Sequence, residues 1–151
     1  VCLVPEKRKE ITTEGGLNIN KNKKKLLFII KKLNNKKIRT SLFLNSNLKD
    51  VRLAKKLGAN CIEIHTGKIS NLVKKNKNYS YELNKITQCA ILANSIGLEV
   101  HAGHGMDYKT TKILTKNKYI EEFNIGHFVI GESIFFGLKS TIKKFIDIMR
   151  S

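Results

Sequence analysis

The sequence of 151 residues lacks tryptophan altogether and contains only one proline, Pro5, and ten glycines. So little proline and glycine excludes collagen-like and low-complexity proteins. No apolar stretch approaches the ~18 residues that a membrane helix requires, and the N-terminus lacks a charged-then-apolar signal pattern. Hydrophobic residues make up 41% of the chain and charged residues 27%. We therefore expect one folded domain over residues 1–151.

Cysteine is also scarce. The three cysteines, Cys2, Cys61 and Cys89, are odd in number and widely spaced, which disfavours a zinc site or a disulfide framework. Each lies in an apolar run, so we expect each to be a small buried hydrophobic residue. Free cysteines are typical of a reducing compartment, and we predict a cytoplasmic protein.

Acidic residues are few: the chain has 12 Asp and Glu and 29 Lys and Arg, which gives a formal net charge of +17. This balance admits a nucleic-acid-binding protein. Only four of the basic residues are arginine, however, and arginine is the usual reader of bases and phosphates. The lysines stand in runs such as 23–25 among many Asn and Ile. We predict a solvated lysine surface, no specific nucleic-acid partner and no membrane partner.

The hydrophobic pattern alternates between strand-like and helix-like segments. Short apolar runs predict strands at 1–4, 38–44, 61–65, 98–101 and 123–130. Helical periodicity predicts helices at 21–33, 48–57, 79–96, 108–114 and 140–149. Strands that alternate with helices pair in parallel through right-handed crossovers. The fold class is therefore α/β, either a doubly wound open sheet or part of a (β/α)8 barrel.

Two observations favour the barrel. A dinucleotide-binding sheet needs G-x-G-x-x-G after its first strand, and Gly15-Gly16 does not supply it. In barrels the chemistry lies at the C-terminal ends of the strands. All four histidines fall on strands or just after them, and none on a predicted helix. A whole barrel has ~250 residues, so these five βα units amount to part of one, and we expect a segment upstream of residue 1.

Candidate catalytic residues stand on two of these strand ends. Glu63 and His65 share one face of the strand 61–65 and are expected to point into the barrel mouth. A carboxylate there is costly unless it is paired with a lysine of another strand or is functional. His104, between Gly103 and Gly105, suits general acid–base work, because glycine admits a ligand and imidazole titrates near neutrality. A loop histidine bonded to backbone carbonyls is the alternative.

Gly126 and His127 mark a candidate phosphate site. The last loops of a barrel, with the N-terminus of a short extra helix, often hold phosphate through backbone amides. Tight strand–helix packing is the alternative, and Glu132 is an awkward neighbour for a dianion. A metal held by the histidines and Glu63 is disfavoured, because no His-x-His pair puts two ligands on one strand face. We predict no metal.

Four strings of sequence are specific in this order. They are Val4-Pro5-Glu6-Lys7-Arg8 with Thr12-Thr13-Glu14-Gly15-Gly16, then Ile62-Glu63-Ile64-His65-Thr66-Gly67, Ala102-Gly103-His104-Gly105 and Asn124-Ile125-Gly126-His127. Together they resemble the pyridoxine 5′-phosphate synthase family over essentially the whole chain. The resemblance implies a (β/α)8 TIM barrel of which this chain supplies the last five βα units, strands one to three being absent.

The resemblance also implies an activity. The family is cytoplasmic and homo-oligomeric, and needs neither a metal nor an organic cofactor. It joins 3-amino-2-oxopropyl phosphate (1-amino-acetone 3-phosphate) to 1-deoxy-D-xylulose 5-phosphate. The transferase-type reaction closes the pyridine ring and releases pyridoxine 5′-phosphate, phosphate and water, in pyridoxal phosphate biosynthesis.

Roles carry over by motif. His104 is similar to the family's catalytic acid, and Glu63 to the carboxylate that stabilises the transition state. The substrate contacts implied are Thr12 for the deoxyxylulose phosphate, and Gly105, Gly126 and His127 for the amino-oxopropyl phosphate. Two positions depart from the family: His101 replaces a common Asn, and Glu132 replaces a usual Arg.

Part of the family's apparatus is not in these residues. Its other acid–base groups, a His and a Glu, lie on the second and third barrel strands. We therefore predict that the 151 residues alone are inactive. The alternatives are another phosphate-binding barrel lyase or isomerase, an inactive remnant, and a basic RNA-binding protein. A Schiff-base lyase would need a lysine inside a strand, which none of the predicted strands carries.

Overall fold

The computed structural model describes residues 1–5 and 15–150. Within them the chain forms five strands and seven helices. The strands are β1 (Cys2–Leu3), β2 (Ser41–Leu44), β3 (Cys61–His65), β4 (Glu99–Gly103) and β5 (Glu122–Asn124). The helices are α1 (Ile19–Asn35), α2 (Leu48–Lys56), α3 (Gly67–Lys74), α4 (Ser80–Ser95), α5 (Tyr108–Leu114), α6 (His127–Phe136) and α7 (Leu138–Arg150).

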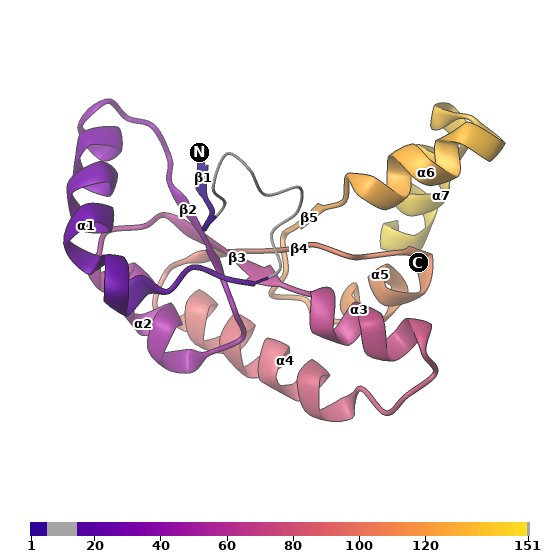
Figure 1. Cartoon of the computed structure of the whole chain (residues 1–151), viewed down its shortest axis with the longest axis horizontal. Coiled ribbons are helices and arrows are strands. Elements are labelled where there is room, and N and C mark those ends of the chain that lie inside the picture. Colours follow the sequence, from indigo (N-terminus) through magenta and orange to yellow (C-terminus); the bar gives the residue numbers. More distant parts are fainter. Residues whose placement is uncertain (6–14, 151) are drawn as a thin grey trace.

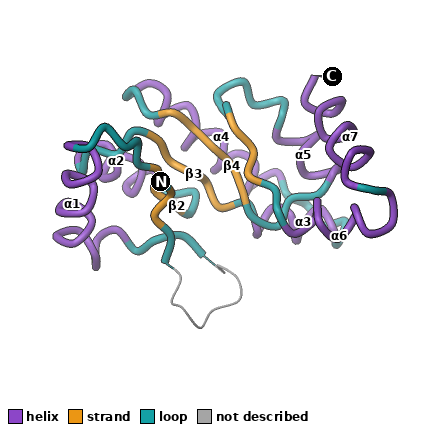
Figure 2. The backbone as a smooth tube through the Cα atoms, turned by 90° about the horizontal axis from the view of Figure 1, so that it is seen from above, coloured by secondary structure: helices purple, strands orange, loops and turns teal. Residues whose placement is uncertain are grey.

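The five strands form one parallel sheet in the order β1-β2-β3-β4-β5. Each strand therefore pairs with the next one along the chain, as Figure 2 shows for β2, β3 and β4. A doubly wound sheet reverses its strand order at a switch point. The described strands have no such reversal, so the open-sheet alternative does not describe this chain.

The two faces of the sheet differ in what covers them. Side chains alternate between the faces of a strand. One set is buried in the main hydrophobic core: Leu42, Leu44, Ile62, Ile64, Val100 and Ala102. Helices α1, α2, α4 and α5 lie around this side (Figure 1). The opposite face presents Phe43, Glu63 and His101. None of the described helices covers it between β2 and β4, and we call it the open face.

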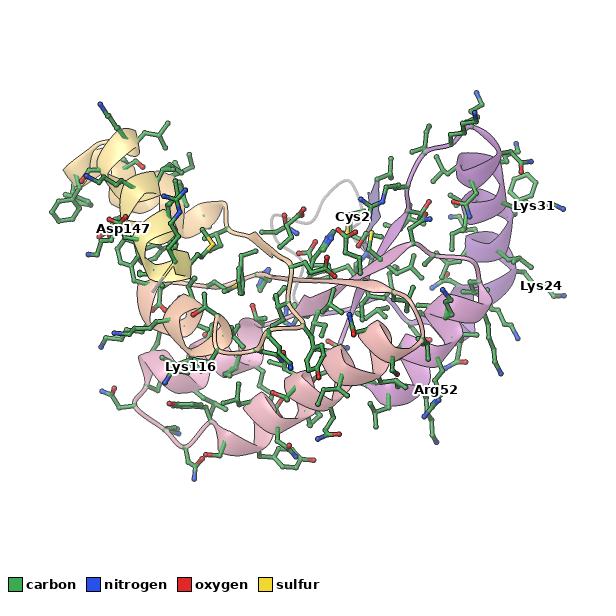
Figure 3. The ribbon with its side chains drawn as sticks, turned by 180° about the vertical axis from the view of Figure 1, so that it is seen from behind. Cys2, Lys24, Lys31, Arg52, Lys116 and Asp147 are labelled. Atoms are coloured by element: carbon green, nitrogen blue, oxygen red, sulfur yellow. The ribbon has the colours of Figure 1, made fainter. Side chains whose placement is uncertain are left out.

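Helix α1 illustrates how lysine-rich segments fold here. The side chain of Asn18 accepts a hydrogen bond from the Lys21 amide and caps the helix. Leu26 and Ile30 are buried on the inner side, whereas Lys24 and Lys31 point outward (Figure 3). The predicted solvated lysine surface is confirmed for this helix. Within the described residues, no helix is long and apolar enough to cross a membrane.

The structure corrects three expectations. The predicted strand 123–130 ends at Asn124, and His127 opens helix α6, so one histidine does lie on a helix. The sequence pattern predicts no helix or strand over 67–74, but this segment forms helix α3. Cys61 and Cys89 are buried free thiols as predicted, but Cys2 is exposed, because β1 is an edge strand of only two residues.

Candidate functional site

Glu63 lies on the open face, in the middle of β3. Its Oε2 accepts a hydrogen bond from Asn124 Nδ2 at 3.1 Å and lies 3.5 Å from the Cys2 sulfur, so that β1 and β5 both reach it. Figure 3 shows Cys2 on this side of the sheet. Burial raises the pKa of Glu63, while Cys2, His101 and Asn124 counteract the rise. The carboxylate is therefore held by hydrogen bonds in a partly desolvated position.

Gly103 makes room for this carboxylate. It ends β4 and pairs with Asn124 on β5. A Cβ at this position would lie 2.2 Å from Glu63 Oε1 and 3.1 Å from the Asn124 backbone oxygen. No side chain fits there unless Glu63 moves. Gly103 thus leaves the space that the Glu63 carboxylate on the neighbouring strand occupies.

His104 follows directly after β4 with a φ of +80°, in the left-handed region that a non-glycine residue rarely adopts. Its ring stacks on that of His65, with centroids 4.7 Å apart. A Cβ on Gly67 would lie 2.8 Å from one ring and 2.9 Å from the other, so that glycine is required beside the pair. Strained backbone of this kind persists only where its surroundings hold it, and it gathers at active sites.

Thr66 is the residue that holds the His104 loop. Its hydroxyl lies 2.7 Å from the carbonyl oxygens of both Gly103 and His104, and its amide donates to the Gly103 oxygen at 2.8 Å. The side chain is fully buried. Loop β3–α3 is therefore tied to loop β4–α5. Sequence reasoning missed Thr66, because only the pairing of β3 with β4 brings it to that loop.

A pocket of about 590 Å³ opens beside the two stacked histidines. It is lined by His65, Gly67, Lys68, Asn71, Leu72, Lys75, Lys77 and His104. Lys68 forms an ion pair with buried Glu82 at 2.5 Å. With three lysines in its wall, the pocket attracts anions.

Gly126 and His127 lie at the N-terminus of α6, with Gly126 as its N-cap. Among the described residues, no side chain caps this end, and no atom lies within 4 Å of a Cβ built on Gly126. The φ of Gly126, −108°, suits any residue. Packing thus does not require glycine here, whereas free amides at a helix N-terminus suit an anion. The packing alternative for Gly126 is not supported.

The structure places Glu63 in the middle of β3, and it places His104 and Gly105 directly after the carboxyl end of the paired strand β4. Gly126 and His127 follow the next strand, β5, and lie two and three residues beyond Asn124, which donates a hydrogen bond to Glu63. Thr12 lies outside the described residues.

One cluster of possible metal ligands occurs among the described residues: Glu99, His101 and Glu122, whose ligand atoms lie within 4.8 Å of one another. It involves none of the residues predicted to be catalytic. The two ring nitrogens of His101 face different carboxylates, Nε2 toward Glu99 at 2.8 Å and Nδ1 toward Glu122 at 3.4 Å. The contact with Glu99 is a hydrogen bond, whereas Nδ1 and Glu122 lie only within ion-pair distance.

Comparison with known families decides what the site belongs to. The model of the family described as pyridoxal phosphate biosynthesis protein PdxJ matches residues 1–151. The chain belongs to this family. It is 63% identical to the pyridoxine 5′-phosphate synthase of Pelagibacter ubique (strain HTCC1062), over 98% of this chain and 62% of that protein. The resemblance stated from the four sequence strings is confirmed.

More distant PdxJ relatives bear the same name. The pyridoxine 5′-phosphate synthase of Zymomonas mobilis is 48% identical over 95% of this chain and 56% of its own length. That of Aquifex aeolicus is 37% identical over the whole chain and 64% of its own length. The chain thus spans less than two thirds of each of these relatives.

Proposed function

We propose that this chain carries part of the active site of a pyridoxine 5′-phosphate synthase. The reaction joins 3-amino-2-oxopropyl phosphate to 1-deoxy-D-xylulose 5-phosphate and yields pyridoxine 5′-phosphate, phosphate and water. One observation carries the proposal: Glu63 in the middle of β3 and His104 just past the carboxyl end of the paired strand β4 both lie beside glycines that leave their side chains room. Membership of the PdxJ family supports the choice of substrates.

His104 is the proposed acid–base residue. Condensing an amine with a ketone and closing a ring require repeated loss of water, and each leaving hydroxyl needs a proton. The imidazole lines the pocket and is fixed by the strained loop and by His65. Glu63 is the proposed stabiliser, because an ionised carboxylate beneath the substrate favours the cationic iminium that forms as water leaves. No metal or organic cofactor enters this scheme.

The proposed phosphate contacts lie at two helix-proximal loops. The bare N-terminus of α6 offers the amides of Gly126 and His127 to the phosphate of the amino-oxopropyl substrate. Gly105, exposed next to His104 with a φ of +71°, supplies a further backbone contact. Thr12 is proposed to contact the deoxyxylulose phosphate, by its motif alone.

We further propose that the five βα units belong to a closed (β/α)8 barrel. Consecutive parallel pairing and helices on one side of the sheet support this architecture. Strands β1 and β5 have one described partner strand each, so each has one edge that is not paired with another described strand. A set of apolar side chains on α6 and α7 also stands exposed: Ile130, Ile134, Phe135, Phe136 and Leu138. Three further βα units would pair the edges and cover such a surface.

The remaining proposals concern the protein's surroundings. We propose a cytoplasmic homo-oligomer whose partners are small phosphorylated substrates. The free thiols of Cys61 and Cys89 support a reducing compartment. Basic side chains spread over the outer faces of the helices, as Lys24, Lys31 and Arg52 are in Figure 3, support a solvated surface rather than a nucleic-acid interface.

The test is a ring-closure assay on the natural polypeptide that carries these 151 residues. Pyridoxine 5′-phosphate is measured from the two substrates. We expect His104→Ala to lower kcat by about 10²–10⁴-fold. Gly126→Ala should raise the KM for 3-amino-2-oxopropyl phosphate without loss of stability. Gly131→Ala, within the same helix and equally uncrowded, is the matched control. Undiminished turnover by His104→Ala, or a borohydride-trapped substrate adduct, would overturn the proposal.

A further inference from the structure

The Glu63 carboxylate is contacted from both edges of the sheet. Its Oε2 accepts a hydrogen bond from Asn124 Nδ2 at 3.1 Å, and the Cys2 thiol donates to the same oxygen at 3.5 Å. Cys2 belongs to β1 and Asn124 to β5, and one further strand separates each of these from β3. In a flat sheet, β1 and β5 would lie about 19 Å apart, which is four strand spacings. Because both reach one atom, the open face is concave around Glu63.

The two carboxylate oxygens of Glu63 have different surroundings. Both hydrogen bonds go to Oε2, whereas Oε1 lies over Gly103, in the space that a Cβ of that residue would need. Gly103 is the last residue of β4 and directly precedes His104. Since Glu63 itself stands in the middle of β3, its side chain leans toward the carboxyl end of the sheet. Oε1 is thereby directed to the end at which the proposed acid–base residue lies.

The two donors to Glu63 are neutral, which affects the charge at the site. A thiol and an amide donate a hydrogen bond at neutral pH without adding positive charge. Among residues 1–5 and 15–150, no lysine or arginine forms an ion pair with Glu63, so the lysine partner considered from the sequence does not occur there. A lysine would orient the carboxylate and also neutralise it. Neutral donors orient it and leave its charge to stabilise the cationic iminium of the proposed reaction.

We propose that Asn124 and Cys2 are positioning residues for the proposed ring closure: they hold Oε2 of Glu63 so that Oε1 faces the substrate at the carboxyl end of β4. The inference rests on the proposed function. Neither residue needs to touch the substrate, because each acts through the Glu63 carboxylate. A thiol is a weak donor and an amide a stronger one. Loss of the Asn124 amide should therefore reduce turnover more than loss of the Cys2 thiol.

The first test is the steady-state kinetics of the natural polypeptide that carries these residues. Asn124→Leu keeps the bulk of the side chain and removes the donor. It should lower kcat by about 10–100-fold, because the carboxylate is misplaced, and leave the KM for both substrates nearly unchanged. Asn94→Leu, the same change at an exposed position of α4, is the matched control and should keep full activity. An undiminished kcat in Asn124→Leu, or a rise in KM alone, would overturn the inference.

A pair of cysteine variants separates hydrogen bonding from packing. Cys2→Ser keeps a donor and should retain more of kcat than Cys2→Ala, which removes it. Thermal unfolding of both variants shows how far each change affects stability. Equal losses of kcat in the two variants would contradict the role given to the thiol. This pair also carries the test if Asn124→Leu does not fold.

A crystal structure of Asn124→Leu tests the inference without turnover. The Glu63 carboxylate should rotate, so that Oε1 no longer lies over Gly103. A displaced carboxylate in a protein whose wild type closes no ring would refute the proposed function and support the hold of Asn124 on Glu63. An unmoved carboxylate in a protein whose wild type is active would refute the inference alone.

Discussion

Single glycines decide where the proposed acid–base residue His104 and the proposed stabiliser Glu63 lie. Gly103 is the sharpest case, since a methyl group there would lie 2.2 Å from Glu63 Oε1. The backbone oxygen of Asn124 closes the other side at 3.1 Å, so the strand cannot yield easily. We predict that Gly103→Ala displaces the Glu63 carboxylate and lowers kcat for ring closure at least tenfold, about 1.4 kcal/mol in the barrier.

The control for this prediction is Gly131→Ala in α6, where no described atom lies within 4 Å of the new Cβ. Alanine in place of a helical glycine stabilises by about 0.5–1 kcal/mol, and activity should stay unchanged. Steady-state kinetics and thermal unfolding of both variants make the comparison. Wild-type turnover in Gly103→Ala would contradict the role given to this glycine.

The ionised Glu63 side chain is expected to lower the stability of the fold while it serves the proposed reaction. Burial raises the pKa of Glu63 above its ordinary value of 4.5, so the native state favours the protonated form more than the unfolded chain does. The protonated carboxyl therefore favours the folded state. This contribution to stability is fully present below the pKa of Glu63 in the unfolded chain, and it is lost as the pH rises through the pKa in the folded protein. Glu63→Gln carries no such charge. It should therefore unfold at a higher temperature than wild type at neutral pH, with no detectable turnover.

The measurement is the unfolding temperature of both proteins from pH 4 to pH 8. The advantage of Glu63→Gln should narrow toward the acidic end, where the wild-type carboxyl is protonated. Glu121→Gln, at an exposed position, serves as the control. A constant or inverted difference would contradict the cost assigned to the buried charge.

At the scale of elements, the hydrogen bonding of the Thr66 hydroxyl links the loop after β3 to the loop after β4. Thr66→Val keeps the shape of the side chain but leaves the Gly103 and His104 oxygens without this donor. We predict a loss of about 1–3 kcal/mol of stability and a lower kcat, because the strained His104 backbone is then less firmly held. Thr66→Ser keeps the hydroxyl and should retain most of both. Equal loss in the two variants would show that the methyl group, not the hydrogen bond, is important.

The helices and strands also show what could and could not be predicted from the sequence. Strand 61–65 and helix 108–114 match the structure residue for residue, because each has a clear apolar period bounded by polar turns. The prediction of a strand over 123–130 was wrong where helix α6 begins. The apolar residues of α6 occur on every side of the helix, so no amphipathic period indicates a helix there. Helix α3 has a buried stripe at Ile69 and Val73, but at eight residues it is too short for a strong signal. Strand pairing brings Thr66 to His104 and Gly103 to Glu63. The sequence of any one segment does not predict these contacts, because each joins two segments that lie apart in the chain.

At the scale of the whole molecule, the described residues leave a sheet with two edges and an exposed apolar surface on α6 and α7. Both are liabilities in a free chain. We predict that the 151 residues alone form no pyridoxine 5′-phosphate. Supplying in trans the part of the Pelagibacter ubique relative that lies outside the match should restore turnover, because it brings the strands that the barrel and the proposed acid–base set require.

Two measurements follow this complementation: product formation, and the fluorescence of an apolar dye that binds exposed hydrophobic surface. If the added units close the barrel, dye binding should fall as activity appears, with both changes saturating at the same ratio of the two chains. A second copy of this chain could cover the apolar surface instead. In that case dye binding would fall with the concentration of the 151 residues alone, and no activity would accompany it. Turnover by the isolated chain would contradict the barrel proposal directly, since a sheet with two free edges would then suffice for catalysis.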